Sequence, residues 1–295
     1  MIRRLSSRLK SFAHAVTLAL IAGVSTPALA QWPKFTPSGV PKTPDGKVDL
    51  DAAVPRAADG KPDLSGVWDV IPCIDCPARG RGEAAAPGGR GQGRGAAGPP
   101  RASMGNIGGA LPNGAPYQPW AADLVKKRMA DNSKDNPDAH CLPIGIAQMN
   151  AHPYPRKIIQ TPREVLLIYE ASGTTVREVF LDGRTLPKDP EPWWHGYSVG
   201  RWEGETLVIE TSGFMDDGWL DVRGSPLTSA GKVTERFRRV KYGYLELEET
   251  IDDPKAYTQP FSAKLFYRLN PETQLSEFVC LDKDAAHYVG GASAK

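Results

Sequence analysis

The sequence predicts an all-β protein whose main part is an antiparallel barrel of roughly eight to ten strands, accompanied by one helix. The first observation behind this prediction is a succession of short apolar runs that fills the chain from residue 156 onward. The second is that short turn sequences such as Glu203-Gly204-Glu205 separate neighbouring runs, as in consecutive hairpins. The third is alternation with a period of two, which gives each strand one apolar and one polar face, as in closed barrels.

The expected strands lie at residues 63–68, 157–161, 164–170, 174–181, 197–202, 206–211, 232–240, 244–251, 261–269 and 274–281. The clearest alternation is at 232–240, where Val233 and Phe237 share a face with Glu235. Glu235 and Arg236 point to opposite faces of this strand, so one of the two is expected inside the barrel.

The first 30 residues have the pattern of a secretory signal peptide. Four basic residues and no acid precede an apolar run at 15–24, and small residues end the segment at 27–30. We therefore expect residues 1–30 to be removed and the protein to be periplasmic or secreted. The Arg3-Arg4 pair leaves both general and twin-arginine export open. No other apolar run approaches the roughly 20 residues that span a bilayer, so no stable membrane insertion is expected.

The remaining chain divides by composition. Residues 31–62 predict an extended lead-in, 63–76 the first strand region, and 77–118 a disordered insertion rich in Gly, Arg and Pro. Residues 119–295 are expected to hold a helix at 119–132 and the main barrel. The chain has 36 basic and 34 acidic residues, and four of the basic ones lie in the leader. The processed chain is thus slightly acidic, and we expect no nucleic-acid partner.

Four cysteines, Cys73, Cys76, Cys141 and Cys280, predict disulfide bonds in an exported protein. The favoured pairing is Cys141 with Cys280, while Cys73 and Cys76 are either bridged locally or free. Cys73 and Cys76 lack the second close cysteine pair that a zinc site would need. They also lack the helix start that a redox centre would need. We therefore expect no metal and no cofactor.

An ordered set of motifs resembles a family of exported bacterial proteins of unknown function. The motifs are DLSGVW from Asp63, CLP from Cys141, KIIQTP from Lys157, DGR from Asp182, GRWEGETLV from Gly200, WLD from Trp219, ERF from Glu235 and TIDDP from Thr250. The likeness covers residues 63–70 and about 140–282, and Glu205 stands where the family usually has Asp. The family implies no activity.

Gly66-Val67-Trp68 also resembles the G-x-W motif that opens the barrel of lipocalins and related calycins. In that fold the Trp closes the barrel floor and an Arg from a late strand packs across its ring. The resemblance therefore implies a lipocalin-like barrel in which Arg236, Arg238 or Arg239 contacts Trp68. Unlike lipocalins, this chain places some 85 residues between Trp68 and the next clear strand.

Candidate pocket residues gather around an aromatic segment. Trp193, Trp194 and Tyr197 flank His195 and offer stacking surface, with Trp202 nearby in sequence. Arg177 or Arg236 is expected to anchor a ligand inside the barrel. The candidate catalytic residues are His195, Asp221 and Glu235, which offer acid–base chemistry.

Three functional hypotheses follow. The first is a barrel that binds a small, partly apolar molecule, such as a carbohydrate or an aromatic compound. The second is a lyase, isomerase or hydrolase on the same barrel, using His195 and a carboxylate as acid and base. The third is a cell-envelope interaction module. Whether the protein is an enzyme, and in what oligomeric state it works, stays open at this point.

Overall fold

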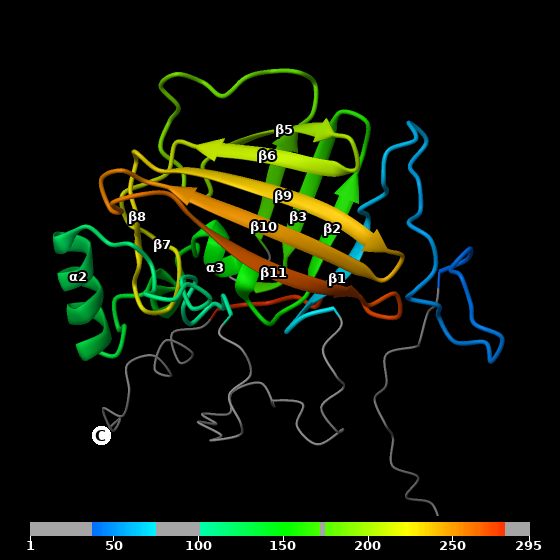
Figure 1. Cartoon of the computed structure of the whole chain (residues 1–295), viewed down its shortest axis with the longest axis horizontal. Helices are drawn as coiled ribbons and strands as arrows, with labels where there is room; N and C mark the ends of the chain where they lie inside the picture. The colour runs from blue at the N-terminus through cyan, green and yellow to red at the C-terminus, as the bar shows by residue number, and fades with distance from the viewer. Residues whose placement is uncertain (1–36, 75–100, 172–174, 281–295) are drawn as a thin grey trace, which may run out of the picture. The chain divides into compact units, whose positions relative to one another are not determined.

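Figure 1 shows the computed structural model of the chain, which describes residues 37–74, 101–171 and 175–280. These residues all belong to one compact unit, residues 36–295. The expected signal peptide at 1–30 and the first part of the expected lead-in, 31–36, lie outside the described residues.

Nine strands close into a barrel, which confirms the predicted fold class. The order around the barrel is β1, β11, β10, β9, β6, β5, β4, β3, β2. The strands are β1 (Gly66–Ile71), β2 (Arg156–Gln160), β3 (Glu164–Tyr169), β4 (Thr175–Phe180), β5 (Tyr197–Glu203), β6 (Thr206–Ser212), β9 (Lys232–Lys241), β10 (Tyr244–Asp252) and β11 (Phe261–Leu269). A separate two-stranded sheet joins β7 (Gly218–Trp219) to β8 (Pro226–Leu227).

The alternation predicted for β9 is confirmed. Val233, Glu235 and Phe237 are buried, whereas Arg236 is partly exposed on the outer face. The next strand continues the pattern, because Leu245, Leu247, Glu249 and Ile251 are buried. Side chains of successive strand residues point to opposite faces, so this parity alone places two glutamates inside the barrel.

One pair of strands departs from the antiparallel prediction. β4 and β5 run parallel, with Val179 opposite Ser198 and Phe180 opposite Val199. The hairpins around them use short turns, but residues 181–196 form a long connection. A connection of this length carries the chain back along the barrel before β5 begins, which a two-residue turn cannot do.

Two other expectations at the ends of the barrel were wrong. The last strand was expected at 274–281, but residues 274–280 form no strand, and residue 281 lies outside the described residues. Of the predicted disordered insertion at 77–118, residues 77–100 lie outside the described residues, but 101–118 is an ordered segment. Its Ile107 is 1% exposed and belongs to the core cluster. A few apolar residues, buried against the rest of the chain, are sufficient to order a segment whose composition suggested disorder.

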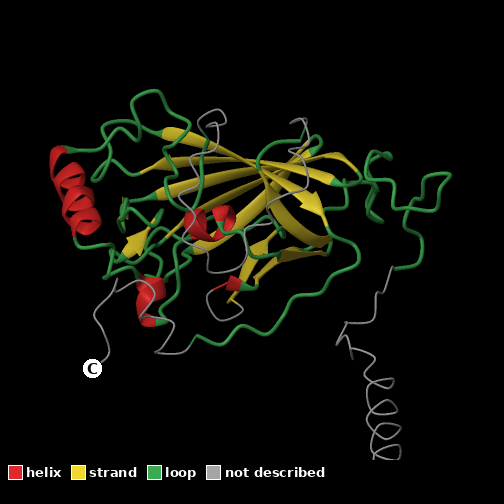
Figure 2. Ribbon diagram, turned by 90° about the horizontal axis from the view of Figure 1, so that it is seen from below, coloured by secondary structure: helices red, strands yellow, loops and turns green. Residues whose placement is uncertain are grey.

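The described residues also form three helical segments. The predicted helix is α2 (Pro119–Ala130), which has Pro in its first turn and Lys127 and Arg128 in its last turn, where positive charge suits the helix dipole. Figure 2 shows α2, the longest red helix, at one side of the yellow strands. A single turn of 3-10 helix (Pro137–His140) and the short helix α3 (Ile146–Ala151) were not predicted.

The floor of the barrel has the contact that the lipocalin resemblance implied. Trp68 is fully buried and its indole Nε1 donates to the Leu64 carbonyl at 3.0 Å. The guanidinium of Arg239 lies 4.9 Å from the Trp68 ring centroid, so Arg239 is the one of the three candidate arginines that makes the contact. Arg239 also donates to the carbonyls of Asp63 and Tyr242, which ties the lead-in to the barrel.

The predicted disulfide between Cys141 and Cys280 is present and joins residues 139 positions apart. Cys73 is also disulfide-bonded, whereas Cys76 lies outside the described residues. Among the described helices, none has the length and apolar character needed to cross a membrane.

Candidate ligand-binding site

A buried ion pair occupies the barrel interior. Arg177 on β4 donates to both carboxylate oxygens of Glu235 on β9, at 3.0 and 2.5 Å. Two further N–H groups of the guanidinium reach Ser198 at 3.0 Å and Thr211 at 2.7 Å. Both charged side chains are almost completely buried, so the pair is stable only because these bonds replace water. The two predicted interior residues, Arg177 and Glu235, are therefore brought together, but they bind each other.

Helix α3 inserts into one end of the barrel beside this pair. The Asn150 amide donates to Glu235 at 2.8 Å and to Glu249 at 3.1 Å, and it accepts from Tyr169 at 2.8 Å. The carbonyl of Asn150 accepts from Tyr267 and Arg156. One residue of α3 thus bonds to β2, β3, β9, β10 and β11, which is possible only inside the ring of strands.

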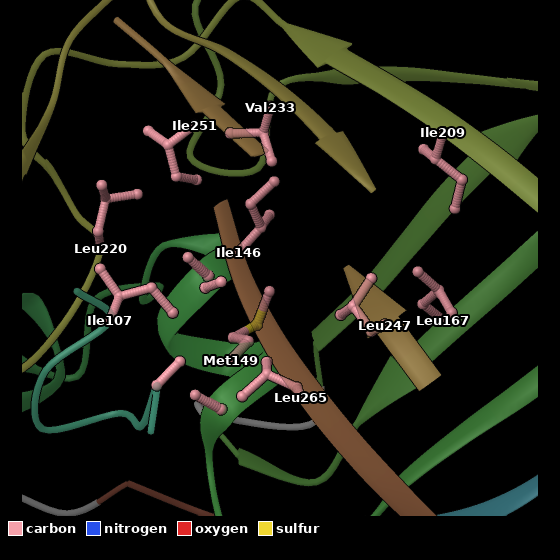
Figure 3. Packing of buried hydrophobic residues seen from close by; sticks show 14 of the residues in the cluster. Ile107, Ile146, Met149, Leu167, Ile209, Leu220, Val233, Leu247, Ile251 and Leu265 are labelled. Carbon is pink, nitrogen blue, oxygen red and sulfur yellow. The ribbon is translucent and has the colours of Figure 1, made fainter. Parts of the chain in front are cut away.

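The apolar side of α3 fills the space around these polar groups. Figure 3 shows Ile146 and Met149 among core side chains of the strands, such as Leu265. All six residues of α3 are buried. Because this helix is only six residues long, it is too short to show the amphipathic period that could have predicted it.

Gly145, just before α3, allows this close approach. A Cβ at this position would lie 2.2 Å from the Trp219 carbonyl oxygen, which is backbone and cannot rotate away. We expect Gly145→Ala to lower the free energy of unfolding by about 1–3 kcal/mol, because overpacking forces the helix or the β7 strand to shift. Urea denaturation measures this loss.

Gly105→Ala is the matched control, since its new Cβ would meet only the Ser103 hydroxyl at 3.8 Å. We expect it to change stability by less than about 0.5 kcal/mol. Equal effects of the two substitutions would contradict the close packing of α3 against Trp219.

Glu249 is the second carboxyl group inside the barrel, and it forms no ion pair within the described residues. It lies directly opposite Glu235 across the β9–β10 pairing. Its Oε2 has no hydrogen-bond partner among the described residues, although the side chain is fully buried. Burial, followed by the nearby charge of Glu235, raises the pKa of Glu249 to about 8. Glu249 is therefore a neutral carboxylic acid at neutral pH.

The three predicted catalytic residues lie in separate environments. The His195 Nε2 is 3.0 Å from the Ile144 carbonyl, so the neutral imidazole donates there, and burial lowers the pKa of His195 to about 4. Asp221 accepts from Ser225 and from the backbone N–H of Ile107. Among the described residues, no hydrogen bond or ion pair joins His195, Asp221 or Glu235 to another of the three.

Several predicted ligand-binding residues lie outside the barrel interior. Arg236 faces outward and pairs with Glu203 at 2.9 Å, which corrects the alternative that it anchors a ligand inside. The Tyr197 hydroxyl accepts from Arg184 at 3.0 Å on the outer surface. Parity places Tyr197 and Arg236 on the outside, because a residue one step from an inward neighbour faces solvent. Trp202 instead shares the inward parity of Ser198, pairs with the buried Leu207, and packs partly buried against the core cluster.

Trp194 is the predicted residue that lines an open site. It borders a cleft of about 380 Å³ between α2, the 3-10 turn and β7, which we call the α2 cleft. The cleft is lined by Leu124, Lys127, Arg128, Asp131, Asp135, Pro137, Leu142, Trp194, Asp217 and Trp219. The neighbouring Trp193 is 55% exposed and does not line it.

Arg128 and Trp219 form the inner wall of the α2 cleft. The Arg128 guanidinium stacks over the Trp219 ring at 4.2 Å and donates to the Gly224 carbonyl at 2.7 Å. Burial lowers the pKa of Arg128, with Asp135 and Asp217 acting in the opposite direction. Because Arg128 covers Trp219, which is 2% exposed, Trp194 supplies the accessible aromatic surface.

The charges of the α2 cleft favour a neutral or cationic ligand. Three carboxylates, Asp131, Asp135 and Asp217, face two cations, and no salt bridge in the described part of the chain engages these acids. Carboxylates that keep free lone pairs accept hydrogen bonds from hydroxyl or ammonium groups.

The sequence reasoning missed Asn150 and Glu249. The signal for Glu249 was available, since it falls in the inward phase of an alternating strand, two residues from Leu247 and Ile251. Asn150 carried no signal, because its role depends on α3 lying inside the barrel.

Within the described part of the chain, no group of three or more His, Cys, Asp and Glu residues is arranged to hold a metal ion. Comparisons of the chain with family models, curated proteins and solved structures gave no match. The functional assignment therefore rests on the chemistry of the α2 cleft and of the barrel interior.

Proposed function

We propose that this protein is exported and binds a small, partly apolar molecule with a sugar or aromatic ring in the α2 cleft. The observation that carries the proposal is a half-buried Trp194 facing a cleft that also holds unpaired carboxylates. An aromatic face binds the apolar side of a ring, and carboxylates accept hydrogen bonds from its hydroxyl groups.

The apolar wall of the cleft supports the same ligand class. Leu142 is 44% exposed and Leu124 half-buried, so both offer carbon surface beside Trp194. The indole N–H of Trp194 makes no hydrogen bond within the described residues and is available to a ligand oxygen. A cleft with apolar walls and a few polar groups is typical of small-molecule sites.

The barrel interior supports binding less well than the α2 cleft. Its strongest anchors, Arg177 and Glu235, are engaged by each other, and Asn150 uses its amide on three strand residues. A ligand would have to displace α3 to reach them. The separation of His195, Asp221 and Glu235 likewise favours binding over acid–base catalysis by that set of residues.

The test uses 4-nitrophenyl glycosides, which join a sugar ring to an aromatic ring, and saturation-transfer NMR on the processed protein. We expect millimolar or tighter binding, and we expect Trp194→Ala to weaken it by about tenfold, a loss of about 1.4 kcal/mol. Trp193→Ala is the matched control, because Trp193 is adjacent and exposed but does not line the cleft.

Two outcomes would overturn the proposal. One is equal weakening by Trp193→Ala and Trp194→Ala, which would place the ligand elsewhere on the aromatic segment. The other is no saturation transfer to any glycoside, which would remove this ligand class. Circular dichroism of each variant separates lost binding from lost folding.

A further inference from the structure

The lead-in contains two copies of one turn, and the two copies pack differently against the barrel. Residues 41–50 and 55–64 share the pattern P-x-x-x-D-G-K-x-D-L. Each copy makes the same three backbone bonds, for example Asp49 N–H to the Pro41 carbonyl and Asp63 N–H to the Pro55 carbonyl. Gly46 and Gly60 occupy the same left-handed position, with φ of +83° and +77°.

The second copy is part of the barrel floor. It ends at Leu64, which is fully buried and accepts the Trp68 indole N–H. The first copy ends at Leu50, which is only half-buried and lies against Gly243 in the β9–β10 turn. The backbone of Gly243 donates to the Leu50 carbonyl at 2.8 Å, and the partly buried Leu50 side chain packs against the outside of the core cluster.

The position of the first copy leaves a groove between it and the end of β11. This groove has a volume of about 470 Å³ and is lined by Lys42, Gly46, Lys47, Val48, Leu50, Arg268, Leu269, Asn270, Pro271 and Glu272. We call it the lead-in groove. In Figure 1 the blue turns of the lead-in lie beyond the strand ends on the side of the β9–β10 turn.

Cations and apolar carbon share the lining of the lead-in groove. Lys42, Lys47 and Arg268 face one acid of the lining, Glu272. Lys47 pairs with Asp45 at 2.7 Å, but the pair is exposed and therefore weak. Within the described residues Lys42 and Arg268 form no salt bridge.

We propose that the lead-in groove binds a small amphipathic anion, a carboxylate or sulfonate with a hydrocarbon or aromatic body. The anionic group lies among Lys42, Lys47 and Arg268, and the apolar body lies on Val48, Leu50 and Leu269. This site is distinct from the α2 cleft, whose three carboxylates disfavour an anion. The proposal therefore does not depend on the proposed glycoside binding.

The probe is 4-phenylbutyrate, with 4-phenylbutyramide as its uncharged counterpart, measured by calorimetry on the processed protein at low salt. We expect the amide to bind about three- to tenfold more weakly, because it loses the charge interaction, and added salt to weaken the carboxylate alone. We expect Arg268→Glu and Lys47→Glu each to lower the affinity for phenylbutyrate by about three- to tenfold.

Lys61→Glu is the matched control, since Lys61 holds the same place in the second turn as Lys47 in the first but does not line the groove. It is expected to leave phenylbutyrate binding unchanged, as is Trp194→Ala. Equal binding of acid and amide, or an equal effect of Lys61→Glu, would overturn the proposal. A third outcome would also overturn it: the protein sediments with phosphatidylglycerol vesicles, loses this binding in Arg268→Glu, and does not bind phenylbutyrate. The groove would then be a membrane contact.

Discussion

Replacing Arg177 with methionine is expected to lower the free energy of unfolding by about 3–5 kcal/mol. The substitution keeps a long apolar side chain but leaves the Glu235 carboxylate buried without its counter-charge. Ser198 and Thr211 lose a partner at the same time. Urea denaturation followed by circular dichroism, without reductant so that the disulfides persist, measures the loss.

The double variant Arg177→Met, Glu235→Leu separates the charge from the packing. Removing both charges is expected to recover most of the lost stability, because replacing a buried pair with apolar residues is often close to neutral. Arg201→Met is the control for a charge on the outer surface, where Arg201 is half exposed and pairs with Glu203. We expect that change to cost less than about 1 kcal/mol. A double variant as unstable as Arg177→Met would contradict the ion-pair account.

Glu249 is expected to make the protein lose stability as the pH rises. In the folded protein the pKa of Glu249 is raised to about 8, from 4.5 for the free side chain, first by burial and then by the charge of Glu235. Between these values the unfolded chain has released the proton and the folded chain retains it. The stability that the proton on Glu249 contributes is therefore fully present only below about pH 4.5. It falls by about 1.4 kcal/mol per pH unit above that value and is lost above about pH 8.

The measurement compares wild type with Glu249→Gln, which keeps the shape and removes the ionisation. The difference in unfolding free energy between the two is expected to change by about 4 kcal/mol from pH 4.5 to 8 in favour of the glutamine variant. Burial lowers the pKa of His152 and of His195 to about 4, so the contribution of these two residues to stability increases as the pH rises. They are present in both proteins and cancel in the difference.

Glu246→Gln is the control on the same strand, because Glu246 lies on the outer face and is partly exposed. Its stability is expected to run parallel to wild type at every pH. Parallel curves for Glu249→Gln would show instead that Glu249 ionises normally, with water or a cation beside its unpartnered oxygen.

The strands were largely predictable from the chain. Each hairpin from β9 to β11 shows its alternation locally, so parity predicted that Glu235 and Arg236 face opposite sides of β9. The structure decided that Glu235 is the buried one of the two. The helix at 119–132 was predicted almost to its ends, since α2 spans Pro119–Ala130. The even number of cysteines predicted disulfide bonds, and the favoured pair, Cys141 with Cys280, is present.

The candidate site was predicted less well. Of the aromatic segment, only Trp194 lines the α2 cleft, whereas Trp193 is exposed and the half-buried His195 bonds to the Ile144 carbonyl. The segment is a loop, in which neighbouring side chains point in unrelated directions and no period fixes their exposure. The other wall of the cleft comes from α2 and β7, which are far apart in sequence.

By itself, the sequence determined the all-β class, the strand faces, the helix α2 and the favoured disulfide, because these depend on local periodicity and on residue type. Only the tertiary structure decided that α3 fills the barrel end, that Glu249 lacks a cation, and that β4 and β5 run parallel. These features depend on contacts between residues far apart in sequence, such as Asn150 with Glu235 and Glu249. Their free energies come from burial and charge pairing, which no local pattern records.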